Sequence, residues 1–386
     1  MLAVVALGCS TMAPPFPPLN TTGVNPDTAP LANSAAYTDK GPYDVGVITV
    51  EIEPGRKAEV WYPAPGGAAI GQTTETYHIR DFLPDLLLNA LPPTVDPPFA
   101  TYAVRGLGVA AGGPFPLVLF SHGATSYRLQ STFLTTHLAS WGFVVVSPDY
   151  FERGIQSLGG TPPAPTRPDD AVAQLAVDAV VGLNTGAGPL SGKIDTTRLF
   201  PIGHSAGGGT SVRLAGSRTD VQSWISMSSG VSTTPTIFNP NPTIPAVLAN
   251  PDKDVMWITG ANDNVAQLGG VVNAYNYSAG EKKLVVIPLS GHNNAMTDIC
   301  EIGRADGGLT GLAYSAGLTL PDFVINLARD GCLPPNYEGP QVWPIVRHFI
   351  TAELRYRSGL DAQPVGLGSG ITSQFGSITP TYQHAP

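Results

Sequence analysis

The chain has 386 residues, an apolar content of 42% and a formal net charge of −9 at pH 7. This length suits one α/β domain with long loops, although two domains would also fit. The acidic balance and the lack of any Lys and Arg cluster argue against a nucleic-acid surface, which needs concentrated positive charge. The composition is therefore that of a globular protein without a DNA or RNA partner.

The three cysteines are predicted to have two different roles. Cys9 follows MLAVVALG, a short apolar run with a Leu-Gly-Cys junction that resembles the end of a lipoprotein signal. We therefore expect a secreted, periplasmic or outer-surface protein with a lipid tether at Cys9; the alternative is a leader that carries no lipid. In an exported protein the remaining pair, Cys300 and Cys332, is more often a disulfide than two free thiols, so we predict a bond between them.

Three parts are predicted along the chain. Residues 1–40 are a leader followed by a flexible tether, rich in Pro, Thr, Asn and Ala, that adds nothing to the core. Residues 41–357 form the main folded domain, and residues 358–386, rich in Gly, Ser, Pro and Gln, form a C-terminal tail. Beyond the leader, no apolar run approaches the roughly 20 residues of a membrane span, so we expect a water-soluble body.

The domain begins with β-rich segments. VGVITVEI and AEVWYPA are separated by the turn-like EPGRK, which predicts an antiparallel hairpin. The next segment, DFLPDLLLNALPP at 81–93, is apolar and interrupted by proline. It is either an ordinary packing helix or a segment that covers a substrate, and the sequence leaves both open.

Strand and helix signals then alternate. The apolar runs FPLVLF, FVVVSPDY, RLFPIGHS, WISMSS, DVMWITG and KKLVVIPL predict strands, and helices are expected at 128–142, 169–183 and 341–357. Such alternation is typical of an α/β fold in which a mostly parallel central sheet has helices on both faces.

The stretch PIGHSAGGG, at 201–209, holds the clearest chemical signal. Gly203, Ser205 and Gly207 give the spacing G-x-S-x-G between a strand-like run and a helix-like one. At such a junction small residues permit a sharp turn that exposes the serine hydroxyl above the sheet. A serine in a Gly-rich turn usually has no chemistry, but this context predicts that Ser205 is a nucleophile.

A serine nucleophile needs a base that accepts its proton and a carboxylate that orients the base. The expected chain order is serine, acid, histidine, so the base must be His292, His348 or His384. His348 lies within the closing helix and His384 within the tail. His292 lies in the loop PLSGHNNAM directly after a strand, and we predict that it is the base.

The carboxylate is predicted from its place relative to a strand. Asp263, in GANDN, follows the strand DVMWITG and so lies at its carboxyl end, where α/β sites are built. Asp252 and Asp254 precede that strand and would lie at the wrong end of the sheet. Asp298, six residues after His292, is a competitor, but capping of a following helix is its simpler role. We predict that Asp263 is the acid.

Acyl transfer also needs N–H donors for the developing oxyanion. One is the N–H of Ala206, directly after the nucleophile, and the loop FSHGATSY offers a second at Ala124. His122 in that loop precedes Ser205 in the chain, so we expect it to orient the loop. No second histidine stands at ligand spacing from it, and neither a metal nor a cofactor is expected.

These residues resemble the α/β-hydrolase superfamily. Within it, the chain is similar to secreted bacterial esterases of the platelet-activating-factor-acetylhydrolase-like, dienelactone-hydrolase-like and cutinase-like polyester-hydrolase groups. FSHGATSYR, HLASWGFVVVSPDY, GHSAGGG and GHNNAMTDIC carry the similarity, which extends loosely from Gly41 to Arg357. Two differences narrow the choice among these groups. Dienelactone hydrolases proper use a cysteine where this chain has Ser205, and the strand ending WISMSSG lacks the carboxylate found there in eukaryotic acetylhydrolases.

The resemblance implies a serine carboxylic-ester hydrolase that forms an acyl-enzyme on a small-molecule or polymeric ester, as a monomer. Ser205 would be the nucleophile, Asp263 the acid and His292 the base, with the N–H groups of Ala124 and Ala206 as oxyanion donors. Two alternatives stay open. The same residues could perform acyl transfer or amide hydrolysis, or the fold could be a catalytically silent binding protein.

Overall fold

The structure is a computed structural model, which describes residues 26–159, 162–231 and 242–386. Cys9 lies outside these ranges. The strands are β1 (Asp44–Glu53), β2 (Arg56–Ala64), β3 (Thr76–His78), β4 (Pro98–Ala100), β5 (Ala103–Arg105), β6 (Phe115–Ser121), β7 (Val144–Pro148), β8 (Ile194–His204), β9 (Ser223–Met227), β10 (Asp254–Gly260), β11 (Lys282–Ile287) and β12 (Thr381–Ala385). The α-helices are α1 (Asp85–Ala90), α2 (Thr132–Ser140), α3 (Asp169–Thr185), α4 (Ala206–Ser217), α5 (Leu268–Tyr277), α6 (Gly308–Ser315), α7 (Asp322–Arg329) and α8 (Gly339–Ser358).

The central sheet has the order β12-β11-β10-β9-β8-β6-β7-β2-β1-β5, and β3 pairs only with β4. The six strands from β7 to β11 in this order run parallel to one another. The predicted hairpin is confirmed, because β1 pairs antiparallel with β2 and β2 pairs antiparallel with β7. The sheet is therefore the mostly parallel one that the sequence predicts.

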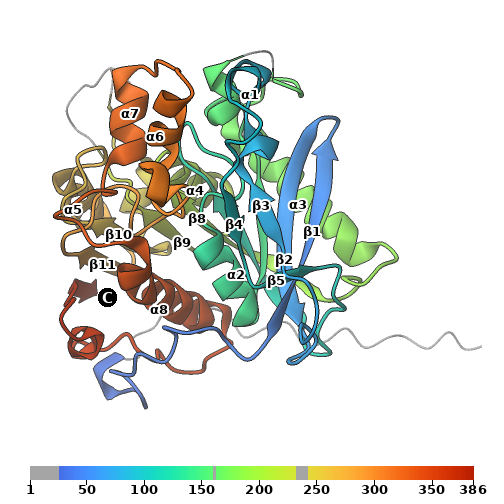
Figure 1. Ribbon diagram of the computed structural model, residues 1–386. Coiled ribbons are helices and arrows are strands. Elements are labelled where there is room, and N and C mark those ends of the chain that lie inside the picture. The colour runs from blue at the N-terminus through green and yellow to red at the C-terminus, as the bar shows by residue number, and fades with distance from the viewer. Residues whose placement is uncertain (1–25, 160–161, 232–241) are drawn as a thin grey trace, which may run out of the picture.

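Helices cover both faces of the sheet (Figure 1). In β6, Val118 and Phe120 pack in the core on the side of α2 and α8, whereas Leu117 and Leu119 pack on the side of α3, α4 and α5. A strand buried on both faces needs apolar side chains at every position, which is why it appears in the sequence as an unbroken apolar run. The observed helices begin and end within four residues of the predicted ranges 128–142, 169–183 and 341–357.

The two ends of the chain differ from the sequence prediction. From residue 26 onward, the segment expected to be a tether contributes to the core, since Tyr37 is buried and packs edge-on against Trp141 with ring centroids 4.9 Å apart. Its hydroxyl also donates a hydrogen bond to Asp361. In the segment expected to be a tail, β12 pairs antiparallel with β11 and extends the sheet. The composition of these two segments predicts flexible chain, but composition does not show which other residues a few of their side chains pack against.

The apolar segment at 81–93 is not an ordinary packing helix. Its helix α1 has six residues and none of them is buried. Figure 1 shows α1 at the same end of the molecule as α6 and α7. Within the described residues, no helix is both long and apolar enough to cross a membrane.

Candidate active site

Ser205 occupies a strained turn between β8 and α4. Its φ of 55° and ψ of −120° lie outside the regions that side-chain-bearing residues prefer, and its N–H donates to the carbonyl of Met227 at 2.9 Å. A Cβ on Gly203 would stand 2.0 Å from the carbonyl oxygen of Gly207, and one on Gly207 would stand 1.9 Å from that of Ser121. The two glycines are therefore required for the turn that presents Ser205.

His292 and Asp263 form a buried pair at the carboxyl ends of β11 and β10. The Nδ1–H of His292 donates to the Asp263 carboxylate at 2.9 Å from Oδ2 and 3.1 Å from Oδ1. Asp263 Oδ1 also accepts the N–H groups of Val265 at 2.9 Å and Ala266 at 2.7 Å, which fix the carboxylate in place. This arrangement fixes the proton on Nδ1 and leaves Nε2 of His292 as an acceptor.

The Nε2 atom of His292 is buried and has no hydrogen-bond partner in the described part of the chain. Its ring lies beside that of His204, the residue before Ser205, with ring centroids 4.6 Å apart. The structure thus brings Ser205, Asp263 and His292 to one edge of the sheet. An unpaired buried acceptor is costly in a folded protein, and such atoms gather where a substrate or a proton completes the set.

The two predicted oxyanion donors flank Ser205. Ala206 is the first residue of α4, and Ala124 follows Gly123, where an added Cβ would stand 3.2 Å from the Cβ of Ser205. Within the described residues, neither the Ala124 nor the Ala206 N–H donates a hydrogen bond. Thr125, next along the loop, has a φ of 55° and donates its N–H to the carbonyl of Arg153 at 2.6 Å.

His122 orients this loop and is not free to act as a base. Its Nε2 accepts the N–H of Tyr150 at 3.0 Å, so its Nδ1 carries the proton that bonds the carbonyl of Gly123 at 2.8 Å. Burial, with the nearby charge of Arg153, holds the pKa of His122 well below its usual range. The ring is therefore a neutral, doubly bonded support.

A buried side-chain bridge that the sequence analysis missed joins the loop of Ala124 to the loop of His292. Gln130 accepts the N–H of Gly123 at 2.7 Å and donates to His204 Nδ1 at 2.8 Å. His204 Nε2–H then donates to the backbone carbonyl of His292 at 2.9 Å. Burial and the neighbouring His292 hold the pKa of His204 well below its usual range, so its ring stays neutral. Gln130 lies 74 residues before His204 in the chain, so its contact with the turn at Ser205 is visible only in the folded structure.

Asp330 is a second residue that the sequence analysis missed. It follows α7, and its Oδ1 accepts the N–H of His292 at 2.6 Å while its Oδ2 accepts the side-chain N–H of Asn264 at 2.9 Å. Asp330 thus ties the loops of His292 and Asp263 to the end of α7. The predicted disulfide between Cys300 and Cys332 is present and closes the segment that contains α6 and α7.

The competing histidines and carboxylates lie elsewhere. His348 is buried in α8 and its Nε2–H donates to the carbonyl of Gly366 at 2.9 Å, and His384 in β12 pairs with Glu281. Asp298 accepts N–H groups at the start of α2, so it caps that distant helix and not a following one. Among the described residues, no group of three or more His, Cys, Asp or Glu side chains could hold a metal ion.

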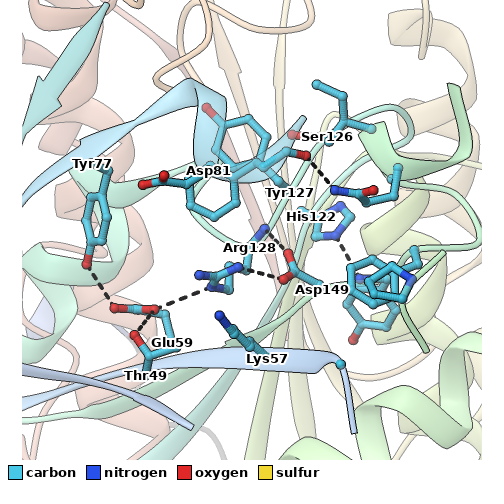
Figure 2. Close-up of a pocket in the computed structure, with 18 of the residues that line it drawn as sticks. Thr49, Lys57, Glu59, Tyr77, Asp81, His122, Ser126, Tyr127, Arg128 and Asp149 are labelled. Carbon is cyan, nitrogen blue, oxygen red and sulfur yellow. Dashed lines mark hydrogen bonds and ion pairs between the residues drawn. The ribbon is translucent and has the colours of Figure 1, made fainter. Parts of the chain in front are cut away.

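Two pockets lie on either side of the loop 124–126. The larger, of about 580 Å³, includes Ser126 and is lined by charged groups that mostly pair with one another (Figure 2). For example, Arg128 donates to Asp149 at 2.7 Å. The smaller, of about 100 Å³, includes Thr125 and is lined by aliphatic side chains from α1, α6, α7 and their flanking loops.

Ser205, Asp263 and His292 follow β8, β10 and β11, and this chain order on a mostly parallel sheet with a strand-to-helix elbow decides the fold. The chain has the α/β-hydrolase fold. A family described as PET hydrolase-like matches residues 108–267 of this chain. The matched range includes Ser205 and Asp263 and ends before His292.

Three curated relatives resemble part of the chain. It is 32% identical over 138 residues to a bis(hydroxyethyl) terephthalate hydrolase of Streptomyces coelicolor, which is 34% of this chain and 40% of the relative. It is 30% identical over 142 residues to cutinase 1 of Thermobifida cellulosilytica, which is 36% of this chain and 48% of the relative. A cutinase of Thermobifida fusca is also 30% identical over 142 residues, 36% of this chain and 42% of the relative. The chain thus spans less than half the length of each of these relatives.

Proposed function

We propose that this chain is a serine carboxylesterase in which Ser205 is the nucleophile, His292 the base and Asp263 the acid. The observation that carries the proposal is the buried Nε2 of His292, which lacks a hydrogen-bond partner among the described residues while Nδ1 is held by Asp263. An imidazole oriented in this way is ready to accept a hydroxyl proton. The names of the relatives, which include cutinases and a terephthalate-ester hydrolase, favour esters as substrates.

In the first half of the reaction Ser205 Oγ attacks the ester carbonyl carbon as His292 Nε2 takes its proton. The carbonyl oxygen becomes an oxyanion, and the free N–H groups of Ala124 and Ala206 stabilise it. His292 then gives the proton to the alcohol oxygen, the bond from carbonyl carbon to that oxygen breaks, and the alcohol leaves. Asp263 stabilises the imidazolium throughout.

In the second half, water replaces the alcohol. His292 Nε2 takes a proton from water, whose oxygen attacks the carbonyl carbon of the acyl-serine. When this second tetrahedral intermediate collapses, the proton returns to Ser205 Oγ and the carboxylic acid leaves. The bridge from Gln130 through His204 holds the donor loop and the base loop at a fixed spacing during both halves.

Covalent labelling tests the proposal. A fluorophosphonate should add once to the wild type, as measured by intact mass, and should not add to Ser205→Ala. Ser217→Ala provides a matched control, because Ser217 lies at the exposed far end of the same helix. A folded wild type that takes no label, or a Ser205→Ala variant that still takes it, would contradict the assignment.

Acyl transfer and amide hydrolysis need the same groups, so product analysis separates them from ester hydrolysis. The ester is incubated in water alone and in water with an added alcohol, and the matching anilide is incubated separately. The free acid should be the main product from the ester in both incubations, and the anilide should be hydrolysed much less. A dominant transesterified product would identify a transferase instead. A catalytically silent binding protein would not react with the phosphonate and would not hydrolyse the ester.

An exported enzyme is part of the same proposal, supported by the bond between Cys300 and Cys332, because such bonds persist in oxidising compartments. The lipid tether at Cys9 stays a prediction. Metabolic labelling with a fatty-acid probe, compared between wild type and Cys9→Ser, tests it.

A further inference from the structure

The pocket of about 100 Å³ beside Thr125 has an unusually uniform lining. Leu87 contributes from α1, and Leu83 and Leu91 contribute from the extended residues just before and just after this helix. The opposite wall comes from α6, α7 and the loop between them, including Leu312 and Val324. Among the described residues, neither a charged side chain nor an aromatic ring lines this pocket, and its polar side chains are the threonines at 125 and 310.

The position of this pocket links it to the reacting atoms. On one side, Thr125 follows the oxyanion donor Ala124. On the other, Ala328 belongs to α7, which is succeeded by Asp330, the acceptor of the His292 N–H. The pocket therefore adjoins both the loop that carries the oxyanion donor Ala124 and the helix that precedes Asp330.

We propose that this pocket binds the acyl chain of the substrate and selects esters of short aliphatic acids; the inference rests on the proposed esterase function. The leaving alcohol oxygen must lie against His292 Nε2, from which it takes its proton. No residue of the loop 289–297 around His292 lines the pocket, whereas Thr125 of the donor loop does. The pocket therefore lies on the acyl side of the ester.

Its size favours a short acyl group. An apolar cavity of about 150 Å³ is known to hold benzene, and this pocket, of about 100 Å³, is smaller. The phenyl ring of benzoate should therefore fit less well than the propyl chain of butanoate, which has half as many carbon atoms. Each methylene that enters should raise kcat/KM about fourfold, the ratio expected for burying one such group, until the pocket is full.

The test measures kcat/KM on the p-nitrophenyl esters of acetate, butanoate, hexanoate, decanoate and benzoate, which share one leaving group. In the wild type, kcat/KM should rise from acetate to butanoate or hexanoate and fall for decanoate and benzoate. Leu87→Trp, which fills the pocket, should lower the hexanoate-to-acetate ratio of kcat/KM at least tenfold. Leu86→Trp is the matched control, because Leu86 is 62% exposed and does not line the pocket.

Leu87→Ala extends the test in the other direction and does not depend on the folding of the tryptophan variant. It should raise decanoate and benzoate relative to acetate. An unchanged ratio in both Leu87 variants would overturn the proposal, as would equal losses on all five esters in Leu87→Trp. A chain-length dependence seen instead among alkyl acetates would assign the pocket to the alcohol. Failure of the esterase function itself is distinguishable, because the wild type would then hydrolyse none of the esters and take no phosphonate.

Discussion

Strands β10 and β11 hold two different clusters of titratable groups at their two ends. At their carboxyl ends lie Asp263 and His292, an ion pair whose Nε2 nitrogen has no hydrogen-bond partner in the part of the chain that the structure describes. At their amino ends lie Asp254, Glu281 and Lys283 in a buried network of charges. A strand of seven residues spans about 20 Å, so the two clusters are well separated within the same pair of strands.

The amino-end network is centred on Arg357 of α8. Its Nε–H donates a hydrogen bond to Glu353 at 2.8 Å, and its two terminal nitrogens form ion pairs of 2.8 Å with Asp254 and Glu281. Lys283 adds contacts of 2.6 Å to Glu281 and 3.0 Å to Glu353. Burial raises the pKa of Asp254 to about 6, while the charge of Arg357 opposes that rise.

The two ends differ in how their charged groups are paired. The amino-end charges are paired in a network that closes α8 and β12 onto the sheet, so they are expected to contribute to stability alone. The carboxyl end keeps a strained serine and an acceptor without a donor, which a folded protein retains at a cost in stability. Variants at the two ends should therefore affect different measurements.

The largest effect is expected at the carboxyl end. Ser205→Ala and His292→Ala should each lower kcat about 10³-fold or more, with residual catalysis from the oxyanion donors. Thermal unfolding of Ser205→Ala should stay close to that of the wild type, since one partly exposed oxygen is removed and no core volume. Retention of more than a tenth of wild-type kcat in either variant would remove that residue from the mechanism.

At the amino end, Arg357→Met should lower the free energy of unfolding by about 3–5 kcal/mol, because it leaves three buried carboxylates without their main partner. The kcat of the folded protein at 25 °C should stay within about twofold. Arg218→Met is the control, since the Arg218–Asp220 pair is partly exposed and should contribute no more than about 1 kcal/mol. A large loss of kcat in folded Arg357→Met would show that the two ends are coupled.

The contrast also explains what could be read from the sequence. Ser205, Asp263 and His292 were predictable because each follows an apolar strand directly, and parallel strands bring their carboxyl ends to one edge. Gln130 and Asp330 were not, because an amide and a carboxylate in loops carry no local pattern, and their partners are remote in the chain. Arg357 was hidden for the same reason: a basic residue near a helix end usually faces water. Periodicity gave strands and helices but could not reveal what Tyr37 buries against.

The disulfide should affect both catalysis and stability, unlike the variants at the two ends of β10 and β11. It closes a loop with a sequence separation of 32, so replacing both cysteines by serine should cost about 3–4 kcal/mol of stability from loop entropy alone. Because Cys332 lies two residues after Asp330, which holds the N–H of His292, kcat/KM should also fall. Phosphonate should still add to Ser205. Alkylation of both cysteines in denatured, unreduced wild type would rule the bond out.

The smallest effect tests whether a carboxylate near the catalytic edge can be purely structural. Asp298 follows β11 on the same side as His292, yet it accepts N–H groups at the start of α2, so Asp298→Asn should leave kcat/KM within about twofold. An asparagine oxygen can still cap the helix, and the loss of stability should be about 1 kcal/mol.

Burial raises the pKa of Asp298 to about 7, above the value near 3.9 of the unfolded chain, while its hydrogen bonds to Thr132 and Phe133 oppose that rise. A raised folded pKa gives a stabilisation that is complete below about pH 4 and is lost as the pH rises through 7. The advantage in stability of the wild type over Asp298→Asn should therefore be greatest near pH 4 and should fall, through zero if the full shift is expressed, as the pH rises to 7 in denaturant titrations. Asp252→Asn, at an exposed position before β10, is the matched control. A difference that grows over this range would mean that the carboxylate is the favoured form and that α2 is held by its charge.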